Sequence, residues 1–473
     1  MVFSSLVFLY LFLPVVLISY YIFPKYLKNT FLLGASLFFY AWGEPKLVIL
    51  MLVSIVINYF IGLAIHNSGS LSRKKAWVAS AVAANLLILG YYKYAGFFIS
   101  VIEDIFKVEI EWEAVPLPIG ISFYTFQAMS YIIDVYRKDA KAQRNIINVA
   151  LYISLFPQLV AGPIVRFQSI ADQIKSRIIS SKKIAEGTKR FIQGLSKKVL
   201  IANPLGEIAD QIFETSAGDL TTATAWIGIL AYSLQIYFDF SGYSDMAIGL
   251  GKFFGFEFEE NFRYPYIAQN VTEFWRRWHI SLSTWFKDYV YIPLGGNRVK
   301  TWMVYRNLLI VWTITGFWHG ASWTFMAWGF YYGVLICLEK WFLADLLKRI
   351  PRFFRHIYLL LIVMIGWVFF RADDFSYAFQ YIQTMFNINT DLFMDHTTIL
   401  ILLENNLYLI IGLILASGFY PKLVLFTKKW KETSLLKEGI LGVSSSIYYL
   451  FLILIVTMFL VNDSYNPFIY FRF

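Results

Sequence analysis

No formally charged residue interrupts the stretch NLLIVWTITGFWHGASWTFMAWGFYYGVLICL, which runs from Asn307 to Leu338. About 20 helical residues are enough to cross a hydrocarbon core about 30 Å thick. A straight helix from Asn307 to Leu338 would be about 46 Å long. The stretch therefore bends or folds back, and we expect the bend at Gly316, His319 and Gly320.

The rest of the 473-residue chain is also strongly apolar. Hydrophobic residues make up 58% of it and charged residues 15%, against roughly 45–50% and about 25% in ordinary soluble domains. This balance excludes a soluble globular chain and a disordered chain. A single cysteine, Cys337, excludes a disulfide scaffold. We expect an all-α polytopic membrane protein with one integral membrane domain over residues 1–473.

Other apolar runs predict further transmembrane or re-entrant helices. They are Val2–Phe23, Phe31–Trp42, Leu47–Ile65, Ala76–Tyr92, Val115–Ile133, Ile146–Val165, Leu220–Phe238, Ile357–Phe370, Asn405–Tyr420 and Gly439–Asn462. Of these, Ile146–Val165 is the one that we expect either to span or to be re-entrant. The path of Phe191–Phe213 stays open, because Lys197 and Lys198 interrupt its apolar pattern.

An excess of Lys and Arg gives the chain a net charge of +10. The basic residues lie in loops between apolar runs, which is typical of the cytoplasmic loops of membrane proteins and does not favour nucleic-acid binding. The segment 166–198 has nine basic and two acidic residues. It is typical of cytoplasmic amphipathic helices on the membrane surface, or else of a solvated loop. Counting crossings from the basic loops places both termini outside the cytoplasm.

Charged, polar and aromatic residues mix between Asn261 and Arg298. Such a segment cannot face lipid, so it lies at the interface or lines a protein cavity. Together with Trp318, its candidate donor-binding or tunnel-lining residues are Trp278, Arg276, Arg277, Asp288 and Asn297. An interfacial helix with an aromatic belt explains the segment equally well. An ion pair within the helix would explain the charges of Glu273, Arg276 and Arg277, which lie three and four residues apart.

His319 is the ionisable residue of the long uncharged stretch. Ionisable groups at membrane depth are costly and usually functional. Burial disfavours an imidazolium, so we expect a neutral ring that could act as a general base. A histidine that hydrogen-bonds between helices as part of the packing is the alternative. No metal site is expected, because the five histidines show no i, i+4 pair.

Five motifs follow one another along the chain: PIGISFYTFQ (118–127), FPQLVAGPI (156–164), FWRRWHISL (274–282), YIPLGGNR (291–298) and GFWHGA (316–321). In this order they resemble the membrane-bound O-acyltransferase (MBOAT) family, and within it the bacterial branch that O-acetylates polysaccharides and peptidoglycan. The resemblance implies a ring of roughly eleven or more transmembrane or re-entrant helices around a central tunnel. It also implies that His319 is catalytic and that His279 is a second catalytic residue.

The resemblance further implies a membrane O-acyltransferase that takes acetyl groups from cytoplasmic acetyl-CoA, as donor substrate, across the bacterial cytoplasmic membrane. The acetyl groups would reach an extracytoplasmic polysaccharide, such as alginate or peptidoglycan, through a second acetyltransferase of the SGNH type or a similar one. No permanently bound cofactor is implied. Residues 466–473 resemble the extracytoplasmic aromatic tail of this branch. Tyr470 is thus a candidate acyl relay, with an aromatic interfacial anchor as the alternative.

Three other functions stay open on the sequence alone. One is a teichoic acid D-alanyltransferase that is charged by a carrier protein. Another is a non-catalytic transporter or flippase, in which polar residues would line a pathway. The third is a scaffold that recruits an extracellular enzyme. Only an acyltransferase would cleave labelled acetyl-CoA.

Sidedness can be tested independently of any chemistry. In a Cys337→Ser background, a membrane-impermeant maleimide should label Ser181→Cys only from the cytoplasm, because the basic segment 166–198 faces inward. Asp219→Cys should react only from outside. Labelling of Asp219→Cys from the cytoplasm would overturn the crossing count and the outward C-terminus.

Overall fold

The computed structural model describes the whole chain except residues 161, 389, 391, 432–434, 463–464 and 468–473, and omits the side chains of 427–438. Every regular element in the described part is a helix, so the expected all-α class is confirmed. Five of the described helical segments are long and apolar enough to cross a membrane. They are Val48–Asn67, Leu71–Phe106, Arg352–Arg371, His396–Ala416 and Gly439–Asn462.

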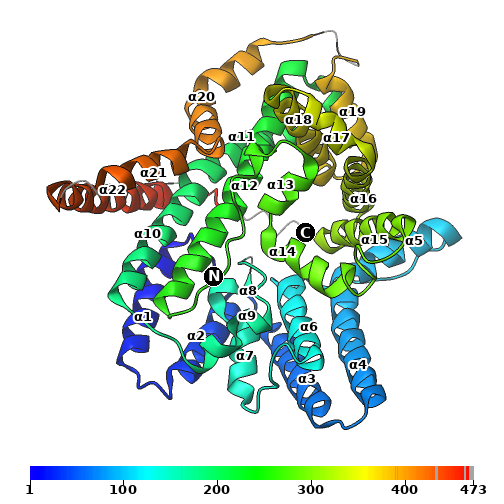
Figure 1. Ribbon diagram of the computed structural model, residues 1–473. Coiled ribbons are helices and arrows are strands. Elements are labelled where there is room, and N and C mark those ends of the chain that lie inside the picture. The colour runs from blue at the N-terminus through cyan, green and yellow to red at the C-terminus, as the bar shows by residue number, and fades with distance from the viewer. Residues whose placement is uncertain (161, 389, 391, 432–434, 463–464, 468–473) are drawn as a thin grey trace. The chain divides into compact units, whose positions relative to one another are not determined.

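The helices gather into two compact units, which are described separately. The first unit contains Met1–Phe191, Met246–Glu260 and Lys287–Tyr289. The second contains Ile192–Asp245, Asn261–Phe286 and Val290–Phe473. Figure 1 labels the helices of both units.

The first unit is built from the N-terminal helices. They are η1 (Phe8–Phe12), α1 (Leu13–Ile22), α2 (Lys28–Gly43), α3 (Val48–Asn67), α4 (Leu71–Leu89), η2 (Gly90–Tyr94), α5 (Ala95–Phe106), α6 (Ile121–Arg137), α7 (Ile146–Ser154), α8 (Phe156–Leu159), α9 (Phe167–Lys175) and most of α10 (Ser181–Lys197). The apolar run 146–165 is therefore broken: α7 and α8 are each too short to cross a bilayer.

Helix α6 is the central helix of the first unit. It packs against α3, α4 and α9, and nearly all of its side chains are buried. Its close contact with α3 depends on Gly62, where a Cβ would lie 2.6 Å from the hydroxyl of Tyr131. Helices α3 and α4 are joined by a pair of amide hydrogen bonds, Asn58 Nδ2 to Asn85 Oδ1 at 3.2 Å and the reverse at 2.9 Å. Such bonds satisfy polar groups that lipid cannot.

The basic segment 166–198 contains the helices α9 and α10, and its place on the cytoplasmic membrane surface stays a prediction. Helix α9 buries Phe167, Ile170 and Ile174. Several basic residues are neutralised by a nearby acidic segment, Glu257–Glu260. Lys183 pairs with Glu257 at 2.7 Å, and this bond holds the pKa of the Glu257 carboxyl below its usual range.

The second unit is built around a hydrophobic core. Its helices are η3 (Lys198–Ala202), α11 (Asn203–Phe213), η4 (Ala217–Asp219), most of α12 (Thr222–Phe253), η5 (Pro265–Ile267), α13 (Val271–Arg277), α14 (Ile280–Phe286), α15 (Thr301–His319), α16 (Trp323–Leu338), η7 (Glu339–Leu343), α17 (Ala344–Arg349), α18 (Arg352–Arg371), α19 (Phe375–Met385), α20 (His396–Ala416), α21 (Phe419–Lys431) and α22 (Leu435–Asn462). A further π turn, η6, covers Lys287–Tyr291.

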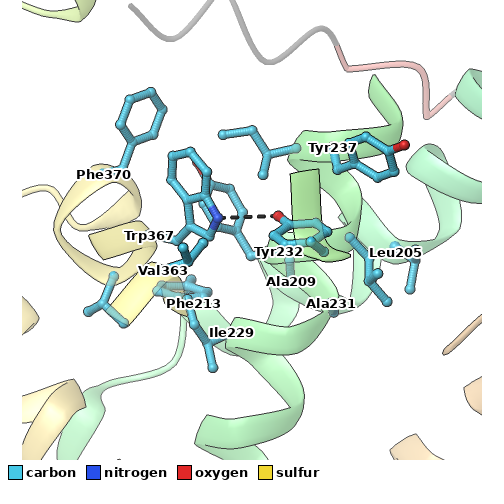
Figure 2. Packing of buried hydrophobic residues seen from close by; sticks show 14 of the residues in the cluster. Leu205, Ala209, Phe213, Ile229, Ala231, Tyr232, Tyr237, Val363, Trp367 and Phe370 are labelled. Carbon is cyan, nitrogen blue, oxygen red and sulfur yellow. Dashed lines mark hydrogen bonds between the residues drawn. The ribbon is translucent and has the colours of Figure 1, made fainter. Parts of the chain in front are cut away.

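Large aromatic side chains fill this core (Figure 2). Phe213 of α11 stacks on Tyr381 with the ring centroids 4.5 Å apart. Trp367 of α18 is 1% exposed and donates its Nε1–H to the hydroxyl of Tyr266 at 3.2 Å. Tyr266 in turn donates to the carbonyl of Ser233. Each aromatic side chain buries a large apolar surface, and a buried Tyr hydroxyl or Trp N–H usually finds a hydrogen-bond partner. The bonds of Trp367 and Tyr266 therefore fix the orientation of these two rings.

The long uncharged stretch folds back on itself, as predicted. Helix α15 ends at His319, and α16 begins at Trp323, with the side chain of Ser322 accepting from the N–H of Phe325. The two helices touch through glycines. A Cβ on Gly316 would lie 2.2 Å from the carbonyl oxygen of Phe325, and one on Gly329 would lie 2.3 Å from that of Trp312.

The open path of Phe191–Phe213 is a continuous run of helix, α10–η3–α11. The two lysines that interrupt its apolar pattern are paired with aspartates of α12. Lys197 lies 2.7 Å from Asp245, and Lys198 lies 2.8 Å from Asp239. The Lys198 and Asp239 side chains are 4% and 2% exposed. A buried charge is tolerated when it is paired in this way.

The glycine contact between α15 and α16 predicts a large effect of one methyl group. Gly316→Ala should lower the free energy of unfolding by about 1–3 kcal/mol, because the backbones must separate. Thermal unfolding of the purified protein in detergent measures this. Gly34→Ala, also within a helix but with nothing within 4 Å of the new Cβ, is the matched control and should be neutral or stabilising. Equal unfolding temperatures for the two variants would contradict the prediction.

Candidate functional site

His319 lies at the turn of the α15–α16 hairpin. It is the last residue of α15 and is 4% exposed. Its ring has three aromatic neighbours, with centroid distances of 4.9 Å to Trp318, 5.2 Å to Trp328 and 5.3 Å to Phe370. This surrounding excludes water and favours an uncharged imidazole. The chain itself fills the space at Gly320, since a Cβ there would lie 2.2 Å from the ring of Phe325.

His279 lies at the corner between α13 and α14, and its backbone is left-handed, with φ of 42°. A left-handed non-glycine residue costs about 1–3 kcal/mol and is often found at functional sites. The side chain is 2% exposed. His279 lies outside the five apolar helices named above, and burial lowers the pKa of its imidazole to about 3. The ring is therefore neutral at physiological pH.

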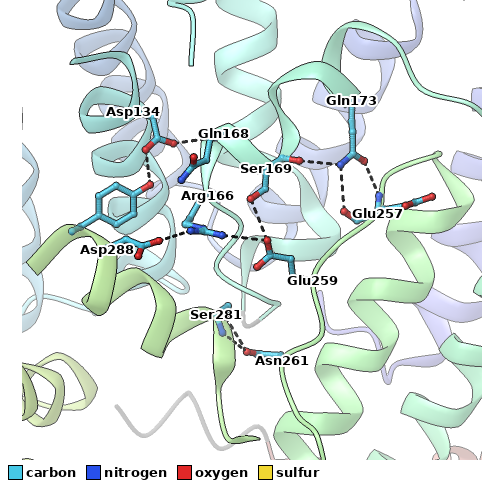
Figure 3. A network of polar contacts seen from close by, with 11 residues as sticks. Asp134, Arg166, Gln168, Ser169, Gln173, Glu257, Glu259, Asn261, Ser281 and Asp288 are labelled. Carbon is cyan, nitrogen blue, oxygen red and sulfur yellow. Dashed lines mark hydrogen bonds and ion pairs between the residues drawn. The ribbon is translucent and has the colours of Figure 1, made fainter. Parts of the chain in front are cut away.

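Asn261 holds this corner from a distant part of the chain. Its backbone carbonyl accepts from the N–H of Ile280 at 3.0 Å. Its side-chain oxygen accepts from the N–H and the hydroxyl of Ser281, at 3.1 and 2.9 Å (Figure 3), and lies 3.3 Å from Nδ1 of His279. The residue is 2% exposed. Asn261 therefore fixes the backbone of Ile280 and Ser281, directly after His279, and also contacts the His279 ring.

The Asn261 contacts determine the tautomer of His279. The backbone N–H of Ser281 can only donate, so the Asn261 atom that faces it is the amide oxygen. That same oxygen faces Nδ1 of His279. Nδ1 therefore carries the hydrogen and donates it, which leaves the lone pair on Nε2.

The two histidines share one tryptophan. The ring of His279 lies 6.4 Å from that of Trp318, in an edge-to-face arrangement, and His319 lies 4.9 Å from the same ring. Two buried imidazoles are thus gathered in one aromatic environment. Such a pair can take up and deliver protons where water is scarce.

Helix α13, which leads into His279, is fixed at its N-terminus by two side chains. Asn270 accepts from the N–H of Glu273 at 2.7 Å. Glu339, which is 3% exposed, accepts from the N–H groups of Val271 and Thr272 at 2.7 and 2.9 Å. Negative charge is favourable at the positive end of a helix. Sequence reasoning missed Asn261, Ser281 and Glu339, since none belongs to a local motif with its partner.

The structure places the other candidate residues as follows. Trp278 and Trp318 are buried, at 2% and 4% exposure. Arg276 is exposed. Arg277 pairs with Glu273 at 2.8 Å, which confirms the predicted i, i+4 ion pair and accounts for both charges structurally.

Asp288 and Asn297 have partners of their own. Asp288 belongs to the first unit, where its carboxylate pairs with Arg166, which also lies 3.3 Å from Glu259 (Figure 3). Asn297 is exposed and accepts from the hydroxyl of Tyr291 at 2.8 Å. These contacts explain both residues without a ligand.

Tyr470 lies outside the described residues, as does most of the tail 466–473. Asn466 and Pro467 are described, and both contact the second unit. Within the described part of the chain, no group of three or more His, Cys, Asp or Glu side chains could hold a metal ion.

Comparisons with known proteins agree with the motifs. The profile of the membrane-bound O-acyltransferase family matches residues 132–372, which include His279 and His319. The protein named "Probable alginate O-acetylase AlgI" from Azotobacter vinelandii is 48% identical over 82% of this chain and 78% of its own length. The protein of the same name from Pseudomonas aeruginosa is 47% identical, over 82% of this chain and 76% of its own. The peptidoglycan O-acetyltransferase of Helicobacter pylori is 38% identical, over 82% and 80%.

Proposed function

This chain belongs to the membrane-bound O-acyltransferase family, and we propose that it passes acetyl groups from cytoplasmic acetyl-CoA across the bacterial cytoplasmic membrane to an extracytoplasmic polysaccharide. It is an acyltransferase of the membrane. The names of its relatives support acetyl as the acyl group and alginate or peptidoglycan as the kind of polymer. The observation that carries the mechanism is the pair of buried histidines whose rings both neighbour Trp318.

In the proposed reaction, a hydroxyl oxygen attacks the carbonyl carbon of acetyl-CoA. The new C–O bond forms as the C–S bond breaks, and CoA leaves as the thiol. A ring nitrogen of His319 takes the hydroxyl proton and returns it to the leaving sulfur, so atoms and charge balance. The aromatic neighbours Trp318, Trp328 and Phe370 keep water away from the thioester and so limit hydrolysis.

His279 is proposed to position the donor. Asn261 orients the imidazole through the contact at Nδ1, and the ring so placed is proposed to hydrogen-bond the pantetheine part of CoA. The strained corner holds the ring in one orientation before the substrate binds, which reduces the entropy lost on binding. Trp278 and Trp318 would line the donor path beside it.

The basic segment 166–198 supports a cytoplasmic approach of the donor, because Lys175, Lys182 and Lys189 are exposed there and ammonium groups attract the phosphates of CoA. Beyond the membrane, we propose a separate extracytoplasmic acetyltransferase, of the SGNH type or similar, that completes delivery to the polymer. Tyr470 is proposed as the acyl relay that bridges this gap. A phenol has a pKa near 10, so its ester passes the acetyl group on more readily than an alkyl ester does.

Replacing His319 tests the catalytic assignment. His319→Ala should lower kcat for release of CoA from acetyl-CoA by about 10²–10⁴, because the general base is removed. The purified protein in detergent is assayed with a thiol reagent, and its unfolding temperature is recorded. His66→Ala, an exposed histidine of the first unit, is the control and should keep full activity. A His319→Ala variant with more than half of the wild-type rate would refute the assignment.

His279 and Asn261 should share one kinetic signature. His279→Ala and Asn261→Ala should each raise KM for acetyl-CoA more than they lower kcat, because both disturb donor positioning. Asn406→Ala, at an exposed asparagine of α20, should change neither constant. If His279→Ala instead leaves KM unchanged and lowers kcat as far as His319→Ala does, His279 takes part directly in the proton transfer.

A further inference from the structure

The chain's own C-terminal segment, Tyr465–Pro467, is held by one face of the η3–α11 helix. The hydroxyl of Tyr465 donates to Asp210 at 2.6 Å. The amide of Asn203 donates to the backbone carbonyl of Tyr465 at 3.1 Å. The ammonium of Lys198 donates to the backbone carbonyl of Pro467. Two of these bonds go to the main chain, so they fix the path of the segment rather than one side chain.

The spacing of the α11 residues matches this contact. Asn203, Gly206 and Asp210 are three and four residues apart, so they share one face of an α-helix. A Cβ on Gly206 would lie 2.6 Å from the side-chain nitrogen of Gln235 and 3.0 Å from the hydroxyl of Tyr465. The lack of a side chain at Gly206 therefore admits both groups, and the polar face that contacts the tail is formed by Asn203 and Asp210 on either side of it in the sequence.

A π turn adds Lys198 to the same face. Residues five apart lie on opposite sides of an α-helix but stack in a π-helix, where the N–H of residue i+5 bonds to the carbonyl of residue i. The N–H of Asn203 bonds to the carbonyl of Lys198 in this way. Short π segments are frequent at functional sites. Here the π turn places Lys198 where its ammonium can donate to the carbonyl of Pro467.

Two ion pairs, one buried and one partly buried, hold charged residues of this polar face. Lys198 pairs with Asp239 of α12 at 2.8 Å, and both side chains are almost fully buried. Asp210 pairs with Arg371 of α18 at 2.9 Å. Lys198 and Asp210 are thus already oriented by other helices, so two of the three residues that contact the tail are preorganised for it.

We propose that Lys198, Asn203 and Asp210 form a latch that positions the C-terminal tail for acyl transfer, by fixing the chain immediately before Phe468. This inference rests on the proposed function, in which Tyr470 carries the acetyl group outward. In the sequence, only Phe468 and Ile469 separate Pro467 from Tyr470, which carries the relay hydroxyl. An anchor at Pro467 therefore limits how far that hydroxyl can move.

Two conservative variants each remove one hydrogen bond between the latch residues and the C-terminal segment. Tyr465→Phe removes only the hydroxyl that bonds to Asp210, and Asn203→Ala removes the donor to the tail backbone. Tyr465→Phe should lower kcat for acetylation of the extracytoplasmic acceptor about tenfold, which is the equilibrium effect of one hydrogen bond to a charged group. Asn203→Ala should lower it roughly three- to tenfold, because the bond that it removes joins two neutral groups. KM for acetyl-CoA should not change, in contrast to the His279 and Asn261 variants, because the donor end is untouched.

Tyr377→Phe is the matched control. Its hydroxyl is also part-buried and bonds to the carbonyls of Phe213 and Thr215, at 2.8 and 3.1 Å, without contacting the tail. It should keep the wild-type kcat. All variants are compared by thermal unfolding, and a loss of kcat in Tyr465→Phe at an unchanged unfolding temperature supports positioning.

A second measurement observes the tail directly. Carboxypeptidase Y should trim the C-terminus of Tyr465→Phe and Asn203→Ala several-fold faster than that of the wild type or of Tyr377→Phe. Equal trimming rates would overturn the latch. Faster trimming at an unchanged kcat would overturn its role in positioning. If wild-type protein cleaves no acetyl-CoA at all, the proposed function fails and the positioning role fails with it, whereas the trimming rates still decide whether Tyr465–Pro467 is latched.

Discussion

The contact between Gly316 and Gly329 is the constraint on which the histidine site depends. Two helices can approach this closely only where neither carries a Cβ, and the approach forces the uncharged stretch to turn within a few residues. His319 is the last residue before that turn, so its position follows from the glycines. The rings of Trp318 and Trp328, one from each helix of the hairpin, then lie close to its ring, at 4.9 and 5.2 Å between centroids.

A second constraint governs charged groups of the second unit. A charge that is buried or partly buried needs a partner, and in three cases another helix supplies it. Lys198 finds Asp239, Glu339 finds the N-terminus of α13, and Asp210 finds Arg371. Two of these contacts also position residues of the proposed reaction. Glu339 holds α13, which leads into His279, and Asp210 contacts the C-terminal segment.

Features that depend on local pattern could be predicted from the sequence. The all-α class followed from composition, the turn near His319 from the length of one uncharged run, and the Glu273–Arg277 pair from helical spacing. Features that depend on distant partners could not. Lys198 looked like an interruption, because Asp239 lies 41 positions later on another helix. Asn261 lies 18 residues before the histidine that it orients, and nothing in the residues between them signals the contact.

The left-handed backbone of His279 has an evolutionary consequence. Apart from glycine, few residue types adopt that conformation readily, and Asn, Asp and His lead among them. Amino-acid substitution at position 279 is therefore restricted to a few residue types, namely Gly, Asn, Asp and His. An amide could replace the imidazole without any rebuilding of the α13–α14 corner, whereas a β-branched residue could not. Within such a fold, the chemistry offered at position 279 can diverge while the backbone that presents it stays the same.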